Sequence, residues 1–176
     1  MKEWILDTSE LSDVAHQISA GDRVILSGTV YTARDAAHKR LCDLICNNKP
    51  LPFSIQGATI YYAGPTPTPE HLAIGSCGPT TSSRMDVFTP LLLGSGIKCM
   101  IGKGARSVDV CEAIKRNKAV YLCATGGAGA LAAKHIKACD VIAFEDLGCE
   151  SVKRLTFDKF PLICGSDSNG GTIFNK

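Results

Sequence analysis

Short apolar runs typical of β-strands alternate with helical segments along most of this chain, and this alternation restricts its fold more than any other feature. The strand-like runs are rich in β-branched residues, and glycine or proline follows many of them. Strands are expected at residues 21–31, 58–63, 72–77, 98–101, 119–124, 137–144, 152–157 and 160–165. Helices are expected at 33–47, 80–93, 108–117 and after the glycine-rich turn at 126–129. Such repetition predicts parallel β-structure covered by helices.

The strand-like runs are too numerous for a simple doubly wound sheet. Two of them lie in the C-terminal tail, before a polar turn at 166–171. We therefore expect one α/β domain over residues 1–176, with a mixed sheet, an additional β-layer and covering helices. Ser107 is expected to cap the helix at 108–117. The prolines of Gly64-Pro-Thr-Pro-Thr-Pro69 predict an extended loop, because proline suits neither a helix interior nor a central strand.

Composition argues against several classes of function. The chain has 176 residues, 45% of them hydrophobic, which is enough for the core of one compact domain. Its net charge is only +2, without a long basic run and with few aromatic residues, so generic nucleic-acid binding is not expected. No apolar run reaches the length of a membrane span, and no membrane partner is expected.

The nine cysteines predict free thiols rather than a disulfide framework or a metal site. Residues 1–7 are too short and acidic for a signal peptide, so an odd number of cysteines indicates reduced thiols in a cytoplasmic protein. No Cys-x-x-Cys pair is present, and no metal is expected in this chain. Cys123 and Cys164, within strands, are expected to be buried. Cys77 is interpreted as a packing residue, with a redox-sensitive neighbour of the site as the alternative.

The first candidate motif is Tyr31-Thr-Ala-Arg-Asp-Ala-Ala-His-Lys-Arg40. Arg34 and Asp35 follow a predicted strand at the start of a helix, where backbone N–H groups favour an anion. His38 lies one helical turn after Arg34, on the same face, and is the histidine nearest to this chemistry. His16, His71 and His135 are expected to be bystanders. The alternative is a surface Arg34–Asp35 ion pair that caps the helix.

The second motif, Gly78-Pro-Thr-Thr-Ser-Ser-Arg-Met-Asp86, repeats this arrangement. Thr80 and Arg84 are four residues apart and share a helix face. Two arginines so placed suit a small dicarboxylate, because each guanidinium can fork onto one carboxylate. The alternative is an N-cap cluster of hydroxyl residues without a ligand.

Two glycine-containing turns complete the candidates. Ile101-Gly-Lys-Gly104 places Lys103 between glycines after a strand, where a ligand can approach the backbone closely; an ordinary turn with a solvated lysine is the alternative. Thr125-Gly-Gly-Ala-Gly-Ala-Leu131 lacks the spacing of a nucleotide-binding loop. It is interpreted as a structural turn for close packing of helix and strand.

Taken in order, these segments resemble the β subunit of class I, iron–sulfur-dependent fumarate hydratases and of the related L-tartrate dehydratases. Besides the motifs above, Tyr62-Ala-Gly-Pro-Thr-Pro67 and Phe160-Pro161 carry the resemblance, which runs over essentially the whole chain. By motif position, it implies that Arg34, Arg84 and Lys103 bind substrate and that Thr80 is the catalytic base. It leaves supporting roles to Asp35, His38 and Thr81. Members of the family often carry glycine near Ser83, where a serine could alter substrate preference.

The resemblance also implies a fold, a cofactor and a partner. The chain would correspond to a swivelling β/β/α domain, the C-terminal domain of single-chain members. A separate α subunit would hold a [4Fe–4S] cluster through three of its own cysteines, the active site would lie between the subunits, and two αβ pairs would assemble. The expected reaction is reversible hydration of fumarate to L-malate, with tartrate dehydration as the alternative. Two other possibilities remain: a non-catalytic dicarboxylate-binding module and a nucleotide-binding α/β domain.

Overall fold

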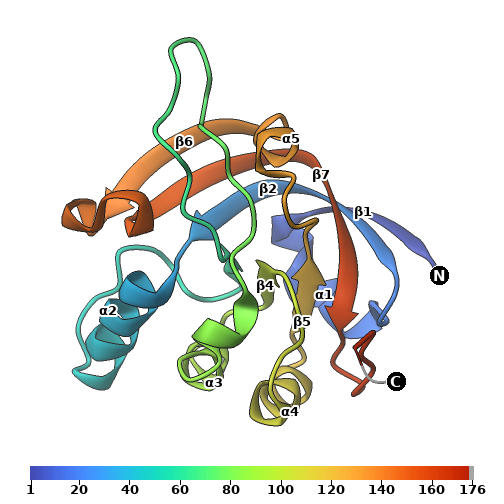
Figure 1. Ribbon diagram of the computed structural model, residues 1–176. Helices are drawn as coiled ribbons and strands as arrows, with labels where there is room; N and C mark the ends of the chain where they lie inside the picture. Colours follow the sequence, from blue (N-terminus) through green and yellow to red (C-terminus); the bar gives the residue numbers. More distant parts are fainter. Residues whose placement is uncertain (175–176) are drawn as a thin grey trace.

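A computed structural model describes residues 1–174 as a mixed α/β domain (Figure 1). The strands are β1 (Glu3–Asp7), β2 (Arg23–Thr32), β3 (Thr59–Tyr61), β4 (Cys99–Gly102), β5 (Val120–Cys123), β6 (Ile136–Ala143) and β7 (Val152–Ser166). The α-helices are α1 (Leu11–Val14), α2 (Asp35–Cys46), α3 (Thr89–Gly94), α4 (Val108–Arg116) and α5 (Gly129–Ala133). Short 3-10 helices are η1 (Thr8–Glu10), η2 (Ala15–Gln17), η3 (Ser82–Met85) and η4 (Glu145–Glu150).

The seven strands form a single sheet that closes on itself like a barrel. Their order is β1-β2-β3-β4-β5-β7-β6, and β2 pairs with β7 as well. The steps from β1 to β5 are parallel, whereas β7 runs antiparallel to β2, β5 and β6. The mixed sheet is therefore confirmed. The expected additional β-layer is not a separate sheet, because β7 is long enough to connect the early and late strands.

Two cores result from this closure. Side chains alternate across a strand, so Tyr61, Ile101 and Leu122 join one buried cluster while Ile60, Met100 and Tyr121 join the other. In Figure 1, α2, α3 and α4 lie together on one side of β3, β4 and β5, while β6 and β7 arch over the opposite side. Strands β3 and β4 are buried along their whole length, as expected of parallel strands covered on both faces.

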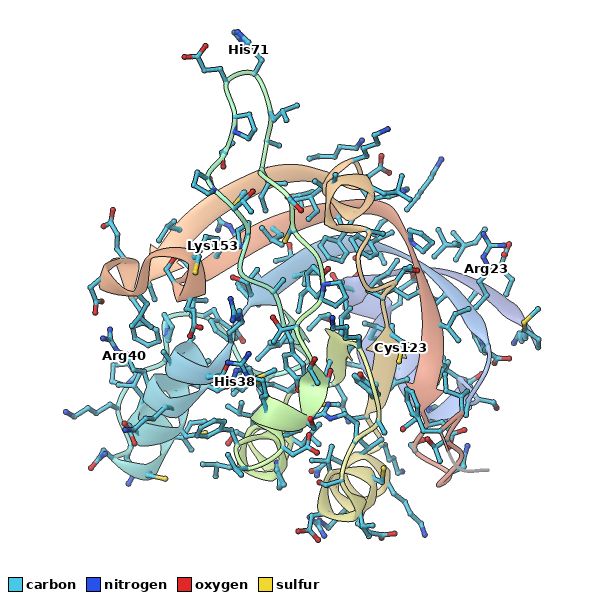
Figure 2. The ribbon with its side chains drawn as sticks, in the orientation of Figure 1. Arg23, His38, Arg40, His71, Cys123 and Lys153 are labelled. Atoms are coloured by element: carbon cyan, nitrogen blue, oxygen red, sulfur yellow. The ribbon has the colours of Figure 1, made fainter. Side chains whose placement is uncertain are left out.

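Several sequence expectations are confirmed. Strands β2 to β6 and helices α2, α4 and α5 lie close to the expected ranges. The Ser107 hydroxyl caps α4 by accepting the Val110 N–H at 3.3 Å. The prolines of residues 65–69 lie in an extended loop that projects from the domain, with His71 at its tip (Figure 2). No helix within residues 1–174 combines the length and apolar character needed to cross a membrane.

The strand expected at residues 72–77 is wrong. These residues form an irregular arm of the projecting loop, and Leu72 is exposed. The opposite arm carries Pro65, Pro67 and Pro69, which have no N–H to donate to a strand ladder. Hydrogen bonds between Thr66 and Ser76 close the base of the loop instead.

Two other expected boundaries are also corrected. The helix expected at 80–93 is divided into η3 and α3, because Pro79 and Thr81 form isolated β-bridges with Ala63 and Lys103, and Pro90 lies in the first turn of α3. The two strands expected at 152–157 and 160–165 are one strand, β7. The chain passes through Lys159 with a φ of 52°, and the register against β2 shifts nearby, as in a β-bulge. Strand β1 and the short helices at 8–17 were not expected from the sequence.

Candidate functional site

The predicted site residues follow neighbouring parallel strands at the same end of the sheet. Arg34 follows β2, Thr80 and Arg84 come after β3 and the projecting loop, and Lys103 follows β4. Carboxyl ends of parallel strands meet at one edge, which is where open α/β sheets bind their ligands.

The two arginine motifs meet through Asp35. Asp35 Oδ1 accepts a hydrogen bond from Arg84 Nε at 3.1 Å, and Asp35 Oδ2 lies 2.8 Å from Arg84 Nη2 as an ion-pair contact without hydrogen-bond geometry. The alternative of an Arg34–Asp35 surface pair is therefore wrong, because Asp35 pairs with an arginine 49 residues away. Arg84 is half exposed and keeps its other edge available to a ligand.

Arg34 lies in a tight, mostly buried position. It is the residue before α2, has an extended backbone and makes no side-chain cap. Its guanidinium lies over Gly64, where a Cβ would come within 2.8 Å of Nη1, so only glycine leaves this space open. Nη2 lies 3.5 Å from Glu150 Oε1, and the buried Nε has no hydrogen-bond partner among residues 1–174. The guanidinium thus retains unused donors.

Thr80 and Lys103 are held by backbone pairing. The Thr80 N–H donates to the Tyr62 carbonyl at 2.6 Å, and Thr81 forms a parallel bridge with Lys103. The Lys103 N–H donates to Ser82 Oγ at 3.0 Å, and that hydroxyl lies 2.8 Å from the Tyr121 hydroxyl. Residues 80–83 are therefore more than an N-cap cluster: Thr81, before η3, makes no side-chain cap, and Ser82 orients the lysine backbone.

The glycine-rich turn after β5 packs against this site. The Cys77 N–H donates to the Gly129 carbonyl at 3.0 Å, and a Cβ on Gly78 would lie 3.3 Å from Gly129 Cα. Gly126 lies beside the Lys103 side chain. The close approach of the backbones supports the structural interpretation of this turn.

Arg106 is a central residue that sequence reasoning missed. Its side chain is fully buried, donates from Nε to Asp86 Oδ1 at 2.8 Å and from Nη2 to Thr89 Oγ1 at 2.8 Å. Its guanidinium lies 5.2 Å from the Tyr62 ring and 4.8 Å from the Tyr121 ring, within cation–π range. The Arg106–Asp86 ion pair links the segment that carries Arg84 to the segment that carries Lys103. The only sequence signal was a basic residue two positions after Gly104.

His38 is buried beneath Arg34 rather than exposed in the site. Its Nδ1 lies 2.9 Å from the Arg34 carbonyl, so the neutral ring donates this hydrogen bond. Burial lowers the pKa of His38 to about 4, and the nearby Arg106 charge acts in the same direction. Figure 2 shows His38 on the inner side of α2, far from His71 at the loop tip. His38 supports the Arg34 backbone and does not act as a proton donor at neutral pH.

This buried histidine predicts a loss of stability in acid. In the unfolded chain His38 has the ordinary pKa of 6.5, whereas in the folded chain its ring is protonated only near pH 4. The free energy of unfolding should therefore fall by about 3 kcal/mol as the pH drops from 6.5 to 4. Urea titrations of wild type, His38→Gln and the exposed control His16→Gln measure this. Parallel pH curves for wild type and His38→Gln would contradict the assignment.

Cys77, which precedes the Gly78–Asp86 motif, is a packing residue. Cys77 is fully buried, and burial raises the pKa of its thiol to about 12, so it stays protonated. Cys164 is also buried as expected, while Cys123 is only partly buried. Within residues 1–174, no group of three or more His, Cys, Asp or Glu side chains is arranged to hold a metal ion.

Comparison with known proteins gives a consistent family. The family model described as "Fumarase C-terminus" matches residues 1–176. The chain is 40% identical over 162 residues to "Fumarate hydratase 2" of Leishmania major, covering 91% of this chain and 28% of that protein. It is 37% identical over 162 residues to "Fumarate hydratase class I, aerobic" of Escherichia coli (strain K12), covering 91% and 30%.

A shorter relative matches over most of its length. The chain is 36% identical over 166 residues to "Putative L(+)-tartrate dehydratase subunit beta" of Methanocaldococcus jannaschii, covering 91% of this chain and 85% of that subunit. The chain thus spans less than a third of these two fumarate hydratases but most of the tartrate dehydratase subunit. With a family model that covers every residue, this chain belongs to the fumarase C-terminus family.

Proposed function

We propose that this chain is the β subunit of a cytoplasmic hydro-lyase that hydrates fumarate reversibly to L-malate. It would act as the swivelling β/β/α domain of an enzyme whose active site is shared with an iron–sulfur α subunit, assembled as two αβ pairs. One observation carries the proposal: Arg34, Thr80, Arg84 and Lys103 follow adjacent parallel strands, and contacts join their segments. Three cations can bind the two carboxylates of a small diacid, and a hydroxyl beside them can transfer a proton.

The cations would bind both carboxylates and favour the transition state. Adding water to fumarate passes through a carbanion-like state whose charge spreads into a carboxylate. Fixed guanidinium and ammonium groups stabilise that added charge more than they stabilise the substrate, which lowers the barrier. Asp35 occupies one edge of Arg84, so the substrate would bind at the edge that remains.

Thr80 would move the proton. In malate dehydration, its Oγ1 would take the proton from the carbon next to a carboxylate, and in hydration it would return that proton. A threonine hydroxyl is far too weak an acid to ionise alone, so a neighbouring cation must lower its pKa. Lys103 is the candidate, because the residue after Thr80 pairs with it in the parallel bridge.

Within residues 1–174, the side chains do not fit as ligands of an iron–sulfur cluster, because no three His, Cys, Asp or Glu side chains are grouped to hold a metal. Cys77, which precedes the second motif, is fully buried with a protonated thiol. The cluster therefore belongs to the α subunit in this proposal, where it would supply Lewis-acid chemistry. The residues of this chain bind, orient and deprotonate the substrate.

Tartrate dehydration is the second candidate. The specific observation in its favour is the relative named as a tartrate dehydratase β subunit, of which the chain covers 85%. L-Malate and tartrate, the hydroxy acids that the two reactions dehydrate, differ by one hydroxyl, and walls of the pocket on the α subunit could select between them.

An anaerobic assay of the chain reconstituted with its α subunit tests these alternatives. Fumarate and L-tartrate are offered side by side, and each subunit alone is the control. Turnover of fumarate supports the main proposal, and turnover of tartrate alone supports the second. An inert pair that binds diacids would indicate a non-catalytic binding module. A rise in melting temperature with ATP or NAD would instead indicate a nucleotide-binding domain.

A further inference from the structure

Glu150 contacts Arg34 from the far end of the sequence. One carboxylate oxygen accepts the Ala36 N–H at 3.0 Å, and the other lies 3.5 Å from Arg34 Nη2. The Ala36 N–H belongs to the first turn of α2, where Arg34 provides no side-chain cap. Glu150 therefore satisfies an N–H at this helix start and pairs with the guanidinium at the same time.

The turn that carries Glu150 is fixed by a buried lysine. The ammonium of Lys153 donates to Ser151 Oγ at 2.7 Å and to the carbonyls of Gly148, Cys149 and Ser151 at 3.1 to 3.3 Å. Lys153 is almost fully buried, so these bonds are shielded from water. Figure 2 shows Lys153 beside the short helix η4, between the sheet and the base of the projecting loop.

The same turn also encloses Arg34. A Cβ on Gly64 would come within 2.8 Å of Arg34 Nη1 and 3.1 Å of the Cys149 carbonyl. Arg34 thus contacts both Gly64 and, through Glu150, the turn at 148–151. Its side chain is 21% exposed, and Glu150 is 22% exposed, so water screens this ion pair only partly.

We propose that Glu150 is a positioning residue that aims the free donors of Arg34 at the substrate. The inference rests on the function proposed above. A carboxylate so close to Arg34 weakens the attraction for a dianion by its charge. The Glu150 carboxylate can therefore favour the reaction only by fixing the direction of the Arg34 guanidinium. Glu150 should therefore contribute to turnover and not to substrate affinity.

The test is Glu150→Gln in the reconstituted αβ enzyme. The amide oxygen still accepts the Ala36 N–H, but the charge that holds Arg34 is gone. We expect kcat to fall about tenfold while KM stays the same or decreases, because orientation is lost but a repelling charge is removed. In an Arg34→Lys background, Glu150→Gln should change kcat by less than about twofold, since the guanidinium it positions is absent.

Asp146→Asn is the matched control. Asp146 forms a bidentate ion pair with Arg40, which also links η4 to α2 but lies away from Arg34. This variant should keep wild-type kcat and KM. If Glu150→Gln does not assemble, Glu150→Asp repeats the comparison, because its shorter side chain withdraws from Arg34.

The outcomes separate this inference from the proposed function. An active wild-type enzyme in which Glu150→Gln keeps wild-type kcat, raises KM, or acts equally in the Arg34→Lys background overturns the inference alone. A loss of kcat shared by Asp146→Asn also overturns it, because any break between η4 and α2 would then suffice. A wild-type pair that neither hydrates fumarate nor dehydrates tartrate refutes the proposed function, and the positioning role with it.

Discussion

Replacing Thr80 by alanine is expected to lower kcat of the reconstituted enzyme by about 10² to 10⁴-fold, the usual contribution of a general base. KM should change little, because the proposed function assigns binding of the diacid to Arg34, Arg84 and Lys103, which this variant leaves intact. The fold should also tolerate the change, since Thr80 is held through its backbone N–H and its side chain is only partly buried. Steady-state kinetics with both directions of the reaction measure the effect.

The control for this variant is Thr156→Ala, which removes an exposed hydroxyl from β7. It should leave kcat unchanged. The cluster content of the α subunit is measured in parallel, so that loss of iron is not mistaken for loss of the base. Turnover close to wild type in Thr80→Ala, with intact cluster, would remove Thr80 from the mechanism.

Replacing Asp86 by alanine is expected to lower the free energy of unfolding by about 3–5 kcal/mol, the typical result of leaving a buried charge without its partner. Arg106 has no solvent exposure in its side chain, so water cannot replace the lost carboxylate. The variant also removes the acceptor for the Ser107 N–H, at 2.7 Å. Urea unfolding of wild type and variant provides the measurement.

Asp140→Ala is the matched control, because the Arg154–Asp140 pair is more than half exposed at both side chains. Water screens such exposed ion pairs, so removal of the Arg154–Asp140 pair should change the free energy of unfolding too little to detect easily. A second variant, Arg106→Met with Asp86→Ala, should be more stable than Asp86→Ala alone, since no unpaired charge is then buried. Equal destabilisation by Asp86→Ala and Asp140→Ala would show that burial of Arg106 contributes little.

The identity of the cations near the site was accessible from the sequence, but their partners were not. Arg34, Arg84 and Lys103 stand out because each follows a strand-like run next to small residues, which is a local pattern. Their partners could not be predicted in this way. Asp35 is 49 residues from Arg84 and Glu150 is 114 residues from Ala36, so no local pattern connects these carboxylates with the groups that they contact. The role of Arg106 could not be predicted, because the residues that contact it come from separate segments of the chain.

The sequence by itself determined the alternation of strands and helices and the packing role of the glycine turn, because periodicity and glycine act over a few residues. Only the tertiary structure decided that β7 is one strand that closes the barrel, that residues 72–77 form no strand, and which carboxylate pairs with each arginine. These features depend on contacts between distant segments, whose energies no short stretch of sequence contains.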